Sequence, residues 1–346
     1  METVFISKLK PLLDAVAKEM ELYVHVKSGE YYFYKKYDAS KEAELNSIRA
    51  CTPVKEFLVP ARQLAATFPH PAEPQKEKPF AVFGLKDCDI RSIQILDRIF
   101  ADEEFADTLY IAKREKMFLI SSDCSEPAAT CFCNLFESEG YPKSGFDLNV
   151  SAIKDGFIIE AGSKKGNNFL KMHQDVFAEV PKTVLAERDK NREQAKKKLA
   201  QINASYKFDG NIRAIVEDGF DSSIIDEEAK NCIECQACTR VCPTCHCFYL
   251  YDTTRKDYFA KMKMWDSCVR CAYAAVAGGA NPRKIVGDRI KHRLMHKFVY
   301  FLDRYGVNMC VGCGRCIDAD AGGIDLREIL KKFNEEYKKE KTKAAK

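Results

Sequence analysis

The chain has 346 residues, 46% hydrophobic and 11% aromatic, which is enough for about two domains with buried cores and excludes a largely disordered protein. Its 55 basic residues nearly balance its 51 acidic ones, so no single-sign field indicates a nucleic-acid partner. No run approaches the ~20 apolar residues of a membrane span, and the N-terminal stretch interleaves charged with apolar residues, unlike a signal peptide. We therefore expect a soluble cytoplasmic protein.

The first half predicts an α/β domain with a mixed sheet. Residues 4–20 have apolar side chains at helical spacing, and strand-like runs follow at 22–26, 31–34 and 56–60. After the proline-rich stretch 68–79, residues 80–85 and 117–121 are typical of buried strands, and 86–100 form an amphipathic helix that Asp87 or Asp89 can cap. Residues 146–163 predict a hairpin that turns at Asp155–Gly156.

The second half predicts mainly helices. A highly charged helix is expected from about Pro181 to Tyr206, and an apolar stripe over residues 290–305 is expected to lie in a core. We therefore divide the chain into an α/β domain with a cysteine site at 1–205, a linker at 206–225, a mainly α-helical two-cluster ferredoxin-like domain at 226–335 and a disordered tail at 336–346.

The chain has an unusually large number of cysteines, sixteen, and eleven of them lie in the segment from Cys232 to Cys316. Because the N-terminus does not read as an export signal, metal binding explains them better than a disulfide scaffold. Residues 232–243 match the bacterial ferredoxin run C-x2-C-x2-C-x3-C-P, in which the fourth cysteine ligates the other cluster of a two-cluster protein. A second C-x2-C-x2-C run begins at Cys310 and has Asp320 and Ala321 where this pattern has Cys and Pro.

If the fourth ligand of each motif binds the cluster held by the other motif, the sequence predicts two [4Fe–4S] clusters. One has the ligands Cys310, Cys313, Cys316 and Cys242, and the other has Cys232, Cys235, Cys238 and, as candidate fourth ligand, Asp320. A carboxylate is a harder ligand than a thiolate, so this second cluster is expected to have a labile iron or a three-iron form. Alternatively, Asp320 is a surface acid, and water or one of Cys245, Cys247 and Cys271 completes the site.

A third cysteine set is predicted in the first half. Cys88 and Cys124 follow the predicted strands 80–85 and 117–121, so both belong at the carboxyl edge of a parallel sheet, where ligands collect. Together with Cys131 and Cys133 they form either a third [4Fe–4S] cluster, which we favour, or a four-thiolate zinc site. About eight irons per chain would mean two clusters, and about twelve would mean three. Cys245, Cys247, Cys268 and Cys271 are not assigned as ligands.

No nucleotide or hydrolase motif accompanies the cysteines, because G-x-G-x-x-G, the P-loop, H-E-x-x-H and G-x-S-x-G are all missing. The strings FGLKDCDIRSIQILD, DCSEPAATCFC, CIECQACTRVCPTCHC, AGGANPR and MCVGCGRC resemble the iron–sulfur β subunits of cytoplasmic NiFe sulfhydrogenases and the corresponding iron–sulfur subunits of the anaerobic sulfite reductases, over about residues 50–330. The resemblance implies an electron-transfer protein between a flavin subunit that exchanges electrons with NAD(P) and a catalytic hydrogenase or reductase subunit. It also supports Cys88, Cys124, Cys131 and Cys133 as one functional set, whereas Asp320–Ala321 departs from the family's Cys–Pro.

Three functional hypotheses follow. The first is a non-catalytic electron-relay subunit of an anaerobic redox complex, without nucleic-acid or membrane-spanning partners. The second is a sulfur-compound reductase subunit with a catalytic Asp-ligated or open-site cluster, which predicts turnover by the isolated chain with an artificial reductant. The third is a zinc-binding interaction module, which predicts a colourless protein.

Overall fold

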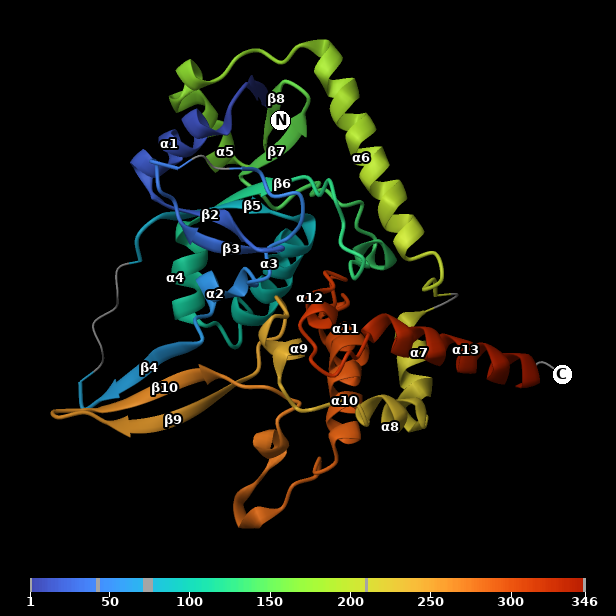
Figure 1. The fold of residues 1–346 in the computed structure, drawn as a ribbon. Helices are drawn as coiled ribbons and strands as arrows, with labels where there is room; N and C mark the ends of the chain where they lie inside the picture. Colours follow the sequence, from blue (N-terminus) through green and yellow to red (C-terminus); the bar gives the residue numbers. More distant parts are fainter. Residues whose placement is uncertain (1, 42–43, 71–76, 209–210, 345–346) are drawn as a thin grey trace. The chain divides into compact units, whose positions relative to one another are not determined.

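The computed structural model describes residues 2–41, 44–70, 77–208 and 211–344 (Figure 1). The chain forms two compact units. The first comprises Met1–Val59 and Gln75–Ile202, and the second comprises Pro60–Pro74 and Asn203–Lys346. A short stretch of the first half of the sequence therefore belongs to the second unit.

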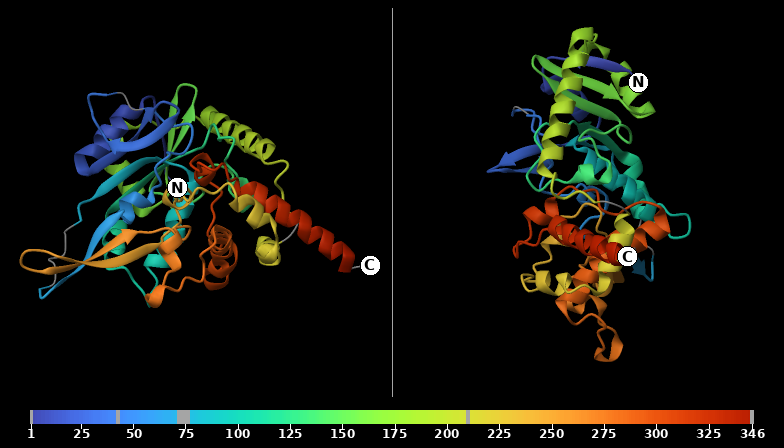
Figure 2. Two further views of the ribbon diagram at one scale, coloured as in Figure 1. Left: turned by 60° about the horizontal axis from the view of Figure 1, so that its bottom comes forward. Right: turned by 90° about the vertical axis from the view of Figure 1, so that its right-hand side faces the viewer.

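The first unit is built on a mixed seven-stranded sheet with the strand order β1-β8-β7-β6-β5-β2-β3. The central strands β2, β5, β6 and β7 are parallel, and the outer pairs are antiparallel. Helices α1 and α5 lie on one face and α3 and α4 on the other (Figures 1 and 2). The strands are β1 Thr3–Ile6, β2 Glu21–Ser28, β3 Tyr31–Lys36, β5 Phe80–Leu85, β6 Met117–Ser122, β7 Leu148–Ile153 and β8 Gly156–Ala161. The helices are α1 Leu9–Glu19, α2 Lys55–Leu58, α3 Asp87–Phe100, α4 Thr108–Lys116, α5 Lys164–Met172 and α6 Lys182–Ile202, with the 3-10 turns η1 Cys133–Phe136 and η2 Gln174–Val176.

One large apolar core of this unit lies between the sheet and helices α1 and α5. Leu12, Leu13 and Val16 on one side of α1 are fully buried, and Phe83 of β5 and Phe169 of α5 belong to the same apolar cluster. Burying large apolar side chains of this kind contributes about 1.5–3 kcal/mol each. This packing fixes β5 and β6, whose carboxyl ends precede Cys88 and Cys124 respectively.

Two local predictions in this unit are wrong, and a third is confirmed in part. Residues 3–6 form β1, so the first helix begins only at Leu9. Residues 56–60 are not a strand, because α2 spans Lys55–Leu58 and the Glu56 N–H bonds the Pro53 carbonyl at 3.2 Å. The predicted cap of α3 is confirmed for Asp89 but not as the N-cap residue: Lys86 is the N-cap, and its N–H donates at 3.2 Å to Oδ2 of Asp89, the third residue of a capping box.

Other local predictions are confirmed. Residues 80–85 and 117–122 form the parallel pair β5–β6, with α3 in the chain between them. Strands β7 and β8 form the hairpin that turns after Ile153, and the charged helix α6 spans Lys182–Ile202.

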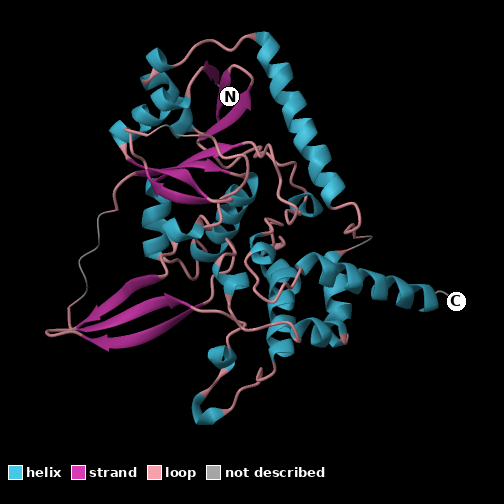
Figure 3. Cartoon of the chain, in the orientation of Figure 1, coloured by secondary structure: helices cyan, strands magenta, loops and turns pink. Residues whose placement is uncertain are grey.

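The second unit combines helices with a three-stranded antiparallel sheet of the order β4-β10-β9 (Figure 3). This sheet is a partial correction of the mainly helical prediction, because residues 62–68 pair with a strand almost two hundred positions later, at Phe68↔Phe259. The strands are β4 Arg62–Phe68, β9 Phe248–Thr254 and β10 Phe259–Trp265. The helices are α7 Ile212–Asp218, α8 Ile224–Ala229, α9 Ala237–Arg240, α10 Val286–Met295, α11 Phe301–Tyr305, α12 Arg315–Asp318 and α13 Leu326–Ala344, with the short turns η3 Gly219–Asp221, η4 Cys271–Ala274 and η5 Ala277–Gly279.

Helices α10 and α11 are joined by a single π-helical turn, η6, at His296–Tyr300. The predicted apolar stripe is core, because Ile290, Leu294, Phe298 and Phe301 along this continuous segment are all buried. Single π-helical turns are rare in proteins, and those that occur are often found at functional sites. Helix α13 runs to Ala344 and so extends into the stretch predicted to be a disordered tail.

Candidate metal centres

The two ferredoxin-type motifs of the second unit adopt the same backbone turn. In the first, Glu234 and Gln236 flank Cys235 in the left-handed region, with φ of 57° and 64°. In the second, Gly312 and Gly314 flank Cys313 with φ of 64° and 74°. The first motif therefore has two non-glycine residues in the left-handed conformation, which costs about 1–2 kcal/mol for each non-glycine residue. Such strain persists where the surrounding structure requires it, typically at a functional site.

The equivalence extends to the hydrogen bonds of the first thiol in each motif. The Glu234 N–H donates to the Cys232 sulfur, and the Gly312 N–H donates to the Cys310 sulfur. Successive N–H groups around alternating right- and left-handed residues form a concave anion site, which is common at iron–sulfur centres. The short helices α9 and α12, which follow the two turns, contact one another.

Seven of the eleven thiols of the second unit fall into two groups that cross between the motifs, and Cys245, Cys247, Cys268 and Cys271 lie outside both. We call Cys242, Cys310, Cys313 and Cys316 the Cys242 group. Burial and the charges of the other three thiols together raise the pKa of Cys316 to about 12, although the charge of Arg293 lowers it. We call Cys232, Cys235, Cys238 and Asp320 the Cys232 group. Burial raises the pKa of Cys238, and the charges of Asp320, Cys232 and Cys235 act in the same direction.

Asp320 is held beside Cys232 by the loop that follows α12. Its Oδ1 accepts the Gly322 N–H at 2.9 Å, and a Cβ on Gly322 would lie 2.1 Å from the Asn231 carbonyl oxygen. Only glycine permits this close approach, which keeps the Asp320 loop against the chain immediately before Cys232. The two groups differ in exposure: Cys242 is buried, whereas Cys235 is exposed.

Two buried cations on consecutive turns of the α10–η6 segment face these thiols. The Lys297 Nζ donates to Cys242 Sγ at 3.3 Å and to Thr244 Oγ1 at 3.4 Å, and its side chain is only 2% exposed. Burial lowers the pKa of Lys297, but the thiolate charges of Cys242, Cys245 and Cys310 outweigh burial and raise that pKa above its ordinary value.

Arg293 lies one turn earlier and faces both groups. Burial lowers the pKa of Arg293, but the thiolate charges of Cys238 and Cys316 outweigh burial and raise that pKa well above the ordinary value. Its Nη2 donates to the Cys238 carbonyl at 3.4 Å, and its buried Nε has no protein partner among the described residues. Buried cations are costly unless anions compensate them. A four-iron cluster with four thiolates has a net charge of roughly −2, so this charge arrangement fits clusters at both groups.

In the first unit, the predicted cysteines lie at the carboxyl edge of the sheet. Cys88 is in the first turn of α3, after β5, and Cys124 follows β6. Burial raises the pKa of Cys133, and the charges of Cys131 and Cys124 raise it further. We call Cys88, Cys124, Cys131 and Cys133 the Cys124 group. Its members are buried or half-buried.

Lys86 is a buried cation of this region, as is Arg49, whose charge also acts on Cys124. Its Nζ donates to the Asn46 carbonyl at 2.6 Å, to Ser122 Oγ at 2.8 Å and to the Asp123 carbonyl at 2.8 Å. Burial lowers its pKa to about 8, and the nearby charges of Cys124, Asp123 and Cys88 act in the opposite direction. Lys86 therefore joins the loop after β6 to the start of α3, the two segments that contain Cys124 and Cys88.

Ser138 and Arg192 complete the support of this site. The Ser138 hydroxyl donates to Asp87 Oδ2 at 2.5 Å and hydrogen-bonds to the Cys133 thiol. Arg192 of α6 pairs with Asp123 and Glu160, each at 2.7 Å, and so holds the residue next to Cys124. Sequence reasoning missed Ser138, Arg192, Lys86, Arg293 and Lys297, because isolated polar residues give no spacing signal.

None of the sixteen cysteines, all within the described residues, forms a disulfide. Among the residues that the structure describes, no three His, Cys, Asp or Glu side chains converge closely enough to hold a single metal ion. Ligands of a single ion must converge on one point, whereas in a cubane cluster each thiolate binds a different iron, so the thiols of a cluster site lie further apart.

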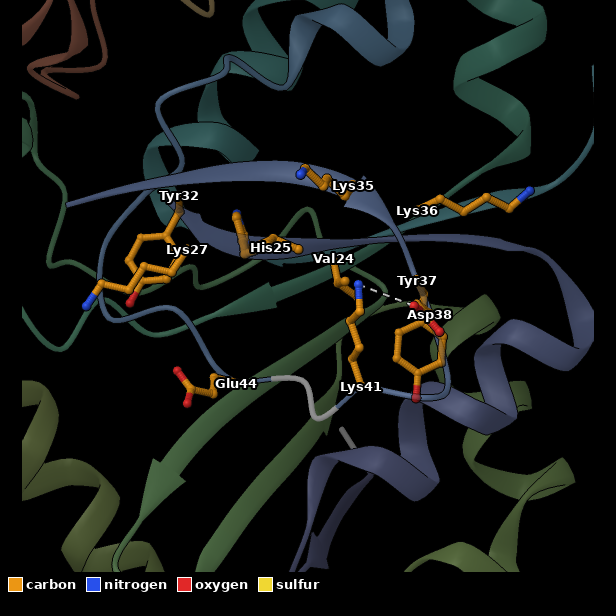
Figure 4. A pocket seen from close by; sticks show the side chains of 11 residues that line it. Val24, His25, Lys27, Tyr32, Lys35, Lys36, Tyr37, Asp38, Lys41 and Glu44 are labelled. Atoms are coloured by element: carbon orange, nitrogen blue, oxygen red, sulfur yellow. Dashed lines mark ion pairs between the residues drawn. The ribbon is translucent and has the colours of Figure 1, made fainter. Parts of the chain in front are cut away.

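A separate pocket of about 270 Å³ lies over β2 and β3, and no cysteine lines it (Figure 4). Its lining is largely basic and aromatic, and the Lys41–Asp38 ion pair of 3.5 Å lies within it. The lining residues are Val24, His25, Val26, Lys27, Tyr32, Lys35, Lys36, Tyr37, Asp38, Lys41 and Glu44.

In the described part of the chain, no helix is long and apolar enough to cross a membrane.

Residues 231–324 match the family model of the 4Fe-4S dicluster domain. The fold and the thiol groups therefore define an iron–sulfur electron-transfer protein. Over 317 residues, 91% of this chain and 92% of the relative, the sequence is 30% identical to sulfhydrogenase 2 subunit beta of Pyrococcus furiosus. The chain belongs to this family of iron–sulfur β subunits.

Proposed function

We propose that this chain is the electron-relay subunit of a multi-subunit anaerobic oxidoreductase complex of the hydrogenase or sulfite and sulfur reductase type. In this role it passes single electrons between a flavin subunit that binds NAD(P) and a catalytic subunit. The observation that carries the proposal is the crossed arrangement of the Cys232 and Cys242 groups, with Arg293 close to both. The name of the relative, a β subunit of a sulfhydrogenase, supports the assembly with partner chains. Location in the cytoplasm remains a prediction.

The proposal assigns a [4Fe–4S] cluster to the Cys242 group, a second to the Cys232 group with Asp320 as fourth ligand, and a third to the Cys124 group. Clusters of this kind exchange one electron at a time at potentials between about −700 and +450 mV. The residues of the chain set those potentials: Lys297 donates a hydrogen bond to a thiolate, and Arg293 adds a buried positive charge. Both favour the reduced, more negative state of a nearby centre.

Anaerobic purification from the native host tests the complex. We expect a flavoprotein and a catalytic subunit to copurify with the chain. A lone monomer would contradict the relay. Iron and acid-labile sulfide analysis tests the centres, with about twelve irons per chain expected and about eight if the Cys124 group holds no cluster.

A second function is favoured by the Asp320 position. Because a carboxylate donates less to iron than a thiolate, the Cys232 group with its exposed Cys235 is suited to bind a small sulfur compound directly. The isolated chain would then reduce such a compound with an artificial electron donor. Asp320→Cys tests the ligand in either case: an unchanged EPR spectrum and iron content would contradict ligation by Asp320.

A further inference from the structure

Cys247 and Cys268 meet at the open end of the β9–β10 hairpin, although neither belongs to a proposed cluster. Trp265 pairs with Phe248, and the ladder continues one step further, where the Asp266 N–H donates to the Cys247 carbonyl at 2.8 Å. Cys268 follows two residues later, and its thiol hydrogen-bonds to the thiol of Cys247. The two thiols are therefore in contact across the open end of the hairpin.

This thiol pair adjoins members of both proposed cluster groups. Cys268 is 4% exposed and packs against Cys238, and Cys247 and Cys316 border the same small core. Cys238 belongs to the Cys232 group and Cys316 to the Cys242 group. The pair therefore lies next to ligands of two separate one-electron centres.

Hydrogen bonds hold the Cys268 segment in place. Thr239, which follows Cys238, donates through Oγ1 to Ser267 Oγ at 2.8 Å. Arg270 donates through Nε and Nη2 to the two carboxylate oxygens of Asp266, both at 2.7 Å. The segment is therefore anchored on both sides of the thiol, so the contact with Cys247 does not depend on a free loop.

We propose that Cys247 and Cys268 form a redox-active dithiol that exchanges two electrons with the centres of the second unit. On oxidation a bond forms between the two Sγ atoms, both thiol protons leave to water, and the two electrons pass singly, one to each centre. Reduction reverses every step. The two thiols are already in hydrogen-bond contact and would have to close to the S–S length of about 2.05 Å. The inference rests on the proposed function, because the clusters are the electron acceptors.

The dithiol gives the chain a store for an electron pair. Hydride donors and acceptors such as flavins and nicotinamides exchange two electrons, whereas each cluster exchanges one. A two-electron couple between two one-electron centres lets the chain accept a pair and release its electrons one by one.

Thiol trapping tests the dithiol in the full-length, anaerobically purified wild-type protein. The protein is equilibrated in buffers with stepped dithiothreitol ratios and quenched with iodoacetamide, and its peptides are mapped by mass spectrometry. We expect Cys247 and Cys268 to lose alkylation together and appear as one linked peptide pair, with a tenfold change in the ratio for each ~30 mV step of a two-electron couple. Cys271, which is exposed, is the control and stays alkylated. Independent alkylation of Cys247 and Cys268 throughout the series would overturn the proposal.

Electron counting provides the second test, with the variants Cys247→Ser and Cys268→Ser and the matched control Cys271→Ser. In anaerobic coulometric titrations we expect the wild type and the control to take up two more electrons per chain than either variant, at equal iron content. Equal electron uptake would overturn the dithiol, and so would a loss of iron confined to the two variants, because they would then be metal ligands. A wild type without iron contradicts the proposed function instead, and thiol trapping then still decides whether the disulfide forms.

Discussion

The two cysteine-bearing regions of the chain are organised in opposite ways. In the second unit, each C-x2-C-x2-C motif is one tight turn, and both turns place left-handed residues at equivalent positions. In the first unit, the Cys124 group comes from the start of α3, the end of β6 and the η1 loop. The first arrangement is set by local backbone geometry and the second by the pairing of β5 with β6. A metal site can therefore be built either from a motif or from a sheet edge.

The buried cations show the same contrast. Lys297 gives one of its hydrogen bonds directly to a thiol, Cys242. Lys86 donates hydrogen bonds to three oxygen atoms and influences Cys124 and Cys88 through its charge. We therefore expect Lys297 to act mainly on redox potential and Lys86 mainly on the structure of its site.

The largest expected effect comes from removing thiols of the first unit. The double variant Cys131→Ala/Cys133→Ala should lose about four irons per chain, while the EPR signals of the second unit persist, because its ligands come from separate turns. Iron analysis and EPR measure both results, and the control is Cys51→Ala, at a half-buried cysteine that belongs to none of the three groups. Loss of all iron would show that the two regions do not assemble independently.

Next in size is the loss of the Arg192 ion pairs in the first unit. Arg192→Ala removes the 2.7 Å ion pair of Asp123 and one of the two 2.7 Å ion pairs of Glu160, which keeps Arg188. It also removes the guanidinium that lies 4.3 Å from the centroid of the Tyr141 ring. Breaking a largely buried pair costs about 3 kcal/mol, so the melting temperature should fall by several degrees. The exposed Lys190→Ala on the same helix is the control and should leave the melting temperature unchanged.

A smaller effect is expected on redox potential. Lys297→Met should lower the midpoint potential of the Cys242-group cluster by about 60–120 mV, one to two tenfold steps of a one-electron couple, because the reduced state loses a hydrogen bond and a positive charge. EPR-monitored titration measures the shift. Lys284→Met, at an exposed position, should leave the midpoint in place. If Lys86→Met moved the potential of its own region as strongly, direct contact with the thiol would not be the cause.

The smallest effect concerns acid stability of the second unit. Burial lowers the pKa of His296 to about 3, from 6.5. Between these values the unfolded chain binds a proton that the folded chain does not, so stability is lost as pH falls from 6.5 towards 3. At pH 5 the loss is about 2 kcal/mol. Thermal unfolding at pH 7.5 and pH 5 should show a smaller difference for His296→Asn than for the wild type; an equal difference would assign the pH effect to other groups.

Local patterns that the chain determines over a few residues were predictable. The ferredoxin spacing from Cys232 to Pro243, the β7–β8 hairpin and the charged helix α6 all follow from neighbouring residues. Residues 56–60 were mistaken for a strand because their apolar run has no periodicity that separates a short helix from a strand. The pairing of Arg62–Phe68 with β10 could not be predicted, since β register depends on a partner far away in the sequence.

By itself, the sequence determined the chemical class of this protein, because thiols at cluster spacing around tight turns are a local property of the chain. The tertiary structure alone decided which buried charges face those thiols, how Asp320 is held beside Cys232, and that Cys247 meets Cys268. Each of these depends on side chains that are distant in sequence and meet only when strands pair and helices pack. Charge and hydrogen bonding act through space, so their partners have no signature in the order of the residues.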